Sequence, residues 1–66
     1  MSKLPSSHTI LKVLLAHGFD FVSQKGSHRK YRKAGRIVIV PHPKKEIPMG
    51  TFRSIIRQSG LNQEDF

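Results

Sequence analysis

The sequence predicts a small two-layer α+β domain with the element order α-β-β-β-α, in which two helices cover one face of a three-stranded antiparallel sheet. Apolar residues recur at helical spacing near both ends of the chain. Between them lie three short segments rich in strand-forming residues, joined by tight turns. The 66 residues have room for one compact domain, expected over residues 1–66. The order is also that of double-stranded-RNA-binding domains.

The first helix is expected to be capped by Ser6 or Ser7 and to run to about His17. Gly18 can end it, because glycine adopts a positive φ without penalty. The Phe, Ile and Leu residues that recur at helical spacing are taken as core residues. The apolar positions of this helix are Ile10, Leu11, Val13, Leu14 and Leu15.

Three strands are expected to follow, over residues 19–24, 28–33 and 36–40. The turn Lys25-Gly26-Ser27 joins the first two, and Ala34-Gly35 forms a tight hairpin between the second and the third. The antiparallel order follows from these short connections.

Pro41-His42-Pro43 is expected to end the third strand, because proline cannot donate to a ladder, and an irregular loop over residues 44–50 should follow. The last helix should begin near Thr51 and end at Gly60, with Asn62 able to cap a further short turn. One face of this helix carries the apolar residues Phe52, Ile55 and Ile56, and another carries Arg53 and Arg57.

The second strand is unusually charged. Strand alternation places His28, Lys30 and Arg32 on one face. It places Arg29, Tyr31 and Lys33 on the other. Only Tyr31 suits a core, so we expect it against the helices and the three basic residues on the open face. A charged central strand buries less apolar surface than an apolar one, which indicates that this face has a function.

Positive charge dominates the composition. Lysine and arginine number 12 against 4 acidic residues, a formal net charge of +8. No acid lies between Asp20 and Glu46. Such a block attracts polyanions, so nucleic acid or an acidic protein is the expected partner. A merely solvated surface is the weaker alternative. The basic residues of this block are Lys25, Arg29, Lys30, Arg32, Lys33, Arg36, Lys44 and Lys45.

Several functional classes are excluded by composition. The chain has no cysteine, which rules out disulfides, thiol catalysis and cysteine-containing zinc sites. The histidines and acids show no metal-ligand spacing, so no metal or cofactor is expected. The first residues lack a signal-peptide pattern, and the apolar runs are too short to cross a membrane, which favours the cytoplasm.

One motif carries a resemblance. The run Gly26-Ser27-His28-Arg29-Lys30-Tyr31 matches a Gly-Ser-His-x-x-aromatic pattern. In this motif the chain resembles the HicA-type, or YcfA-like, toxins, and the resemblance extends over nearly the whole sequence. The further matching segments, in order, are Gly18-Phe19, Val40-Pro41-His42-Pro43, Glu46-Ile47-Pro48-x-Gly50-Thr51-Phe52-Arg53-x-Ile55 and Gly60-Leu61.

The resemblance implies an mRNA interferase that is inhibited by a HicB-type antitoxin, with His28 as the catalytic residue. The chemistry fits, because RNA carries its own 2′-hydroxyl nucleophile and histidine transfers protons near neutral pH. We expect cleavage without a metal, and an antitoxin that covers His28. The expected RNA-binding residues are Lys25, Gly26, Ser27, Arg29, Lys30 and Arg32.

Alternatives remain open at this point. A non-catalytic RNA-binding module would explain the charge and the fold, and an antitoxin-binding subunit with incidental RNA contact would explain the charge. His42 is a second proton carrier, a phosphate contact or, as we favour, a loop residue that is hydrogen-bonded to backbone. Gly50-Thr51 is interpreted as a plain helix start rather than a phosphate site. The free protein is expected to be monomeric, because its charge opposes self-association.

Overall fold

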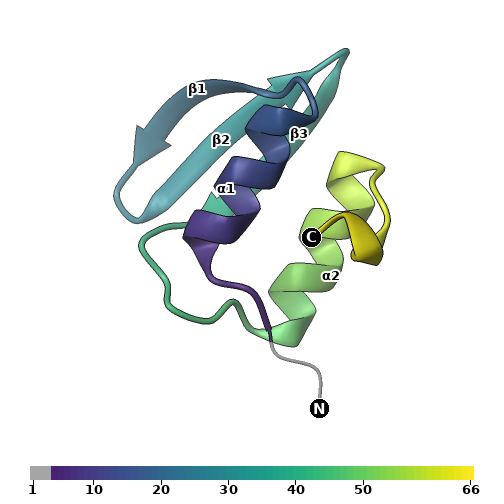
Figure 1. Cartoon of the computed structure of the whole chain (residues 1–66). Coiled ribbons are helices and arrows are strands. Elements are labelled where there is room, and N and C mark those ends of the chain that lie inside the picture. Colours follow the sequence, from purple (N-terminus) through teal and green to yellow (C-terminus); the bar gives the residue numbers. More distant parts are fainter. Residues whose placement is uncertain (1–3) are drawn as a thin grey trace.

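The computed structural model describes residues 4–66, so the first three residues of the expected domain lie outside the described residues. It has the predicted order and a three-stranded antiparallel sheet in which β2 is central (Figure 1). The elements are α1 (Ser7–Ala16), β1 (Asp20–Lys25), β2 (His28–Lys33), β3 (Arg36–Pro41), α2 (Met49–Ser59) and a short 3₁₀ turn, η1 (Gln63–Asp65). The fold class predicted from the sequence is confirmed.

Helix α1 is fixed at both ends by side chains. Ser6 is the cap, and its Oγ accepts a hydrogen bond from the backbone nitrogen of Thr9 at 3.1 Å. At the other end, the Nδ1 atom of His17 lies 2.9 Å from the carbonyl oxygen of Val13. One of the helix-end carbonyls thereby has a partner.

The two hairpin turns have different backbone requirements. Gly26, the first residue of the β1–β2 turn, has a φ of 58°, the sign that a type II′ turn requires at this position. Ala34 and Gly35 have φ values of 47° and 82°, as in a type I′ turn. Positive φ is uncommon for alanine, so the second turn is set by strand pairing rather than by residue preference.

Two predicted boundaries were wrong. Helix α2 begins at Met49 rather than near Thr51. The third strand includes Pro41, which pairs with His28, although we expected proline to end the ladder. The backbone nitrogen of His42 donates to the carbonyl of Ser27 at 2.7 Å, which makes the Pro41 pair a non-hydrogen-bonded one. The proline nitrogen therefore faces away from β2 at the free edge, where no donor is needed.

One core joins both helices to one face of the sheet. Tyr31 is 2% exposed in this core, as its place in the alternation predicted. The core residues are Ile10, Leu11, Leu14, Phe19, Tyr31, Val38, Val40, Ile47, Phe52 and Ile55. The helices supply Ile10, Leu11, Leu14, Phe52 and Ile55, and the sheet supplies Tyr31, Val38 and Val40.

Leu15, which was taken as core, is instead exposed, and so are the strand residues Phe21 and Ile37. Ile37 pairs with Arg32 and so lies on the open face of the sheet. Phe21 pairs with Tyr31 on the helix side, but it belongs to the outer strand β1, at the margin of the core. The apolar arc of α1 is wider than the surface it covers, which leaves Leu15 in solvent.

Helix α2 runs beside the free edge of β3 (Figure 1). The Oε1 atom of Gln58 accepts from the backbone nitrogen of Ile39 at 3.1 Å, and the Arg36 guanidinium donates to the Gln58 carbonyl at 3.4 Å. The Gln58 side chain thus bonds a backbone N–H at the edge of β3 that could otherwise pair with another strand. Within residues 4–66, no helix is long and apolar enough to span a membrane.

Candidate active site

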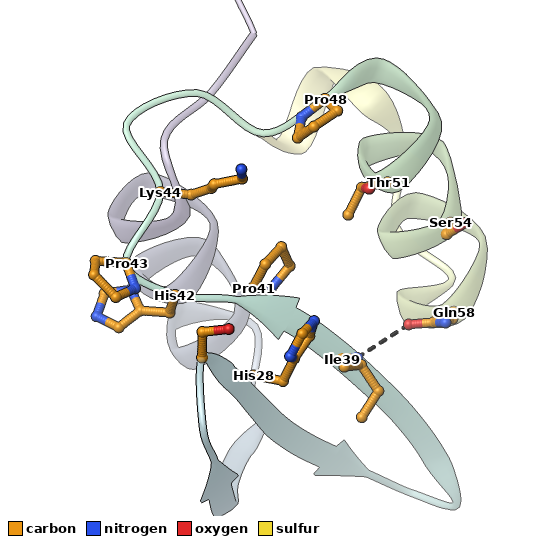
Figure 2. A pocket seen from close by; sticks show the side chains of 11 residues that line it. His28, Ile39, Pro41, His42, Pro43, Lys44, Pro48, Thr51, Ser54 and Gln58 are labelled. Atoms are coloured by element: carbon orange, nitrogen blue, oxygen red, sulfur yellow. Dashed lines mark hydrogen bonds between the residues drawn. The ribbon is translucent and has the colours of Figure 1, made fainter.

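An open groove lies between the sheet and helix α2 (Figure 2). Its volume is about 590 Å³. This is within the range of roughly 300–1,000 Å³ that is typical of small-molecule sites. The lining residues come from the turn before β2 and the first residue of β2, from β3 and the loop after it, and from α2: Ser27, His28, Ile39, Pro41, His42, Pro43, Lys44, Pro48, Thr51, Ser54 and Gln58.

His28, the predicted catalytic residue, stands at one wall of this groove. It is the first residue of β2 and directly follows the Gly26-Ser27 turn. Its ring is exposed and points into the space bounded by Pro41, Ile39 and α2 (Figure 2). Within residues 4–66 the imidazole has no hydrogen-bond partner, so both nitrogens are available to a ligand.

The turn residues of the motif lie at the same end of the sheet. Ser27 lines the groove, and its carbonyl is held by the backbone nitrogen of His42. Gly26 is at the tip of the hairpin, where a β-carbon would meet no atom within 4 Å. The tip of the hairpin beside His28 is therefore uncovered by the rest of the described residues.

Three of the predicted RNA-binding cations share the open face with His28. Lys25 pairs with His28 on the neighbouring strand. Lys30 and Arg32 lie two and four residues after His28 in β2, and so on the same face. Lys25 and Lys30 also line a second, smaller pocket that includes His28 and Ile39. The structure thus brings these cations into one surface that continues from the groove.

Arg29 is placed differently. Its Nε atom donates to Oε1 of Gln24 at 3.0 Å, and its guanidinium carbon lies 5.7 Å from the centre of the Phe21 ring. Phe21 in turn makes an edge-to-face contact with Tyr31, which marks the helix-covered side of the sheet. Arg29 also borders the smaller pocket, but its guanidinium is directed away from the open face.

His42 is anchored on the helix side of the sheet. Its Nδ1 atom lies 2.9 Å from Oγ of Ser7, a buried residue of α1. Ser7 Oγ also accepts from the backbone nitrogen of Lys44 at 2.9 Å and lies 3.2 Å from the Lys44 carbonyl. All three contacts are satisfied when the hydroxyl donates to that carbonyl and the proton is on Nδ1 of His42.

This anchoring separates the two candidate proton carriers. His42 contributes to the rim of the groove, but its ring lies beside Pro43 rather than next to the ring of His28 (Figure 2). We favoured a hydrogen-bonded loop residue, and the ring is indeed held by a hydrogen bond, to the Ser7 hydroxyl rather than to backbone. The geometry supports a role in fixing the loop to α1.

His42 should make stability depend on pH. Burial lowers the pKa of its imidazole below the usual 6.5, and Arg29 and His8 lower it further. Below about pH 6.5 the unfolded state therefore binds more protons than the folded state, and stability falls with acidification through the folded pKa.

His42→Asn removes the titration and keeps an N–H donor for Ser7. We expect this variant to lose less stability than the wild type between about pH 7.5 and pH 5.5 in urea unfolding. Equal losses of stability in the two proteins would show that the pH dependence does not come from His42.

Four polar residues of the groove were not among the predicted site residues. They are Lys44, Thr51, Ser54 and Gln58. Lys44 belongs to the acid-free block, and Thr51 was noted only as a helix start. For Ser54 and Gln58 the sequence holds no signal beyond polar positions on an amphipathic helix, since only the packing of α2 turns them toward His28. Within residues 4–66, histidines and acids form no group of three that suits a metal ion.

Comparison with protein families gives a match over residues 7–61 to the model described as the HicA toxin of bacterial toxin-antitoxin systems. The chain belongs to the HicA toxin family. The match includes every residue that lines the groove and all strands of this HicA-family chain. None of the curated proteins compared with it matches significantly.

Proposed function

We propose that this HicA-family chain is an endoribonuclease that cleaves mRNA without a metal ion, with His28 as its general acid or base. The observation that carries the proposal is the position of His28. Its exposed imidazole lies in the groove between the sheet and α2, at the end of a basic sheet face. An exposed, unpartnered histidine costs the fold nothing to keep and is free to exchange protons with a ligand.

The reaction needs little from the protein. The 2′-hydroxyl of RNA attacks the adjacent phosphorus, the new O2′–P bond forms, and the P–O5′ bond breaks. One proton leaves the 2′-oxygen, and one is delivered to the departing 5′-oxygen. A single imidazole in contact with either oxygen accelerates the step by about 100- to 10,000-fold.

Besides proton transfer, the reaction needs positive charge close to the phosphate. Lys25, Lys30 and Arg32 lie on the face that carries His28, and Lys44 lines the groove from the opposite side. A phosphate placed at His28 would lie between these charges, which favours both its binding and the extra negative charge of the transition state. Ser27 can donate one further hydrogen bond.

The proposed partner is a HicB-type antitoxin. The family belongs to toxin-antitoxin systems, and the basic face complements an acidic protein surface. Because His28 is exposed, an antitoxin that covers the groove inhibits the toxin by blocking access to RNA.

The decisive experiment is an RNA cleavage assay with purified protein. Wild-type protein should fragment a single-stranded RNA in the presence of EDTA, and addition of the antitoxin should stop it. The same sequence made as DNA should remain intact, because it lacks the 2′-hydroxyl. RNA left whole by folded protein would overturn the nuclease proposal.

The second candidate is a non-catalytic RNA-binding module. It is favoured by the continuous basic face, which suffices for sequence-independent binding. It predicts RNA retained on a filter but never cut, so the same assay with a binding measurement separates the two.

A further inference from the structure

The α2 wall of the groove has no part in the proton transfers described above. This wall presents polar side chains that face His28 across an apolar floor (Figure 2). We infer that it is a base-binding subsite, in which the side-chain amide of Gln58 selects the nucleobase next to the scissile phosphate. The identity of the ligand as RNA rests on the proposed function, whereas the subsite itself rests on the groove.

Gln58 is held in one orientation. Its Oε1 atom accepts the backbone N–H of Ile39, so the acceptor end of the amide is committed to the edge of β3. The donor end has no partner within residues 4–66, and the side chain lines the groove. A fixed amide that offers only donors selects bases with an acceptor at that position, such as a pyrimidine O2 or a purine ring nitrogen.

The floor of the subsite suits a planar ring. Ile39 and Pro41 supply apolar surface there, and both belong to the strand that carries the Gln58 contact. Stacking against apolar groups tolerates every base, so it supplies affinity but no selection. Selection is therefore left to the hydrogen bond from Gln58.

The position relative to the chemistry also fits. His28 and Gln58 line the same groove, on opposite sides of Ile39 (Figure 2). Lys44, on the loop that closes the groove, supplies a positive charge for the phosphate. The volume of about 590 Å³ is ample for one nucleotide unit beside His28.

The test replaces Gln58 in two ways. Gln58→Glu keeps an acceptor for the Ile39 N–H and removes the donor, whereas Gln58→Met removes both without adding charge. Gln63→Glu is the matched control, because Gln63 lies in η1, outside the groove. Each protein cleaves a pool of RNA with randomised sequence, and the base composition at the cut sites is read by sequencing the fragment ends.

Wild type and Gln63→Glu should share one base preference next to the cut. Both Gln58 variants should weaken that preference by about threefold to tenfold, the value of one neutral hydrogen bond. A ratio between sites is unaffected by a uniform loss of rate or stability. A wild type without any base preference, or Gln58 variants that keep it, would overturn the subsite while the nuclease activity stands.

A second measurement does not depend on cleavage. The four ribonucleoside monophosphates are titrated into the wild type, and the side-chain amide resonance of Gln58 is followed by NMR. It should shift on binding, by an amount that depends on the base. Such shifts in a protein that cuts no RNA would support the subsite although the proposed function fails. No shift with any nucleotide would overturn the subsite.

Discussion

Replacing His28 with alanine is expected to reduce RNA cleavage by about 100- to 10,000-fold, the usual contribution of a general acid or base. The side chain is exposed and makes no hydrogen bond within residues 4–66, so its loss removes a proton carrier without opening a cavity. The free energy of unfolding should change by no more than about 0.5 kcal/mol, as for other surface substitutions. The measurement is the initial rate of cleavage of a defined RNA, with urea unfolding of the same preparations.

His8→Ala is the matched control for this variant. His8 is also an exposed histidine, but it lies at the start of α1 and does not line the groove. Its substitution should leave the rate unchanged. A folded His28→Ala protein that cleaves as fast as the wild type would remove His28 from the reaction.

RNA affinity measured on the same variant decides between the two candidate functions. Binding by the basic face depends on phosphate contacts from lysine and arginine, so His28→Ala should bind RNA nearly as well as the wild type. Loss of cleavage with retained binding is the result expected of a nuclease. Loss of both, in a folded protein, would instead make His28 a binding residue.

The sequence predicted the sheet well because each strand has a clear local signal. Alternation in β2 placed Tyr31 in the core and His28, Lys30 and Arg32 on the open face, and the pairing of β2 with β3 agrees. Gly26 and Gly35 lie at positive-φ positions of the two turns, and the short connections give the antiparallel order. These are short-range properties, which a sequence expresses directly.

The errors arose where tertiary position overrides residue type. Pro41 extends β3 because its nitrogen happens to face the free edge, and that orientation depends on the phase of the ladder with His28. Leu15 is exposed because the apolar arc of α1 is wider than the surface that it covers, which composition cannot reveal. In both cases the residue follows its usual preference only in a particular place in the fold.

The candidate site was half visible in the sequence. His28 and Ser27 were found through a contiguous motif, and the nearby cations Lys25 and Lys30 through charge. The opposite wall of the groove, including Gln58, comes from a helix some 30 residues away in sequence, and local patterns hold no information on its angle to the sheet. Long-range packing therefore decided what faces the predicted catalytic residue.

Tyr31→Ala is expected to have the largest effect on stability. Tyr31 is the one buried side chain of β2, and it is among the largest fully buried side chains of the core. Removing a large buried aromatic side chain costs about 3–5 kcal/mol. The whole free energy of unfolding of a domain is roughly 0.05–0.15 kcal/mol per residue, or about 3–10 kcal/mol for a chain of this length. We expect the variant to be largely unfolded, as measured by circular dichroism and urea unfolding.

Phe21→Ala provides the contrast, because Phe21 touches Tyr31 edge to face but is 51% exposed. Its loss should cost about 1–3 kcal/mol, the sum of the aromatic pair and the burial of half a ring. Tyr31→Phe keeps the ring and should remain folded, which separates loss of packing from loss of the hydroxyl. If Phe21→Ala proved as damaging as Tyr31→Ala, the core would extend over β1. The only large anchor of the strand that carries His28 is therefore Tyr31, three residues along, and the position of the predicted catalytic side chain depends on it.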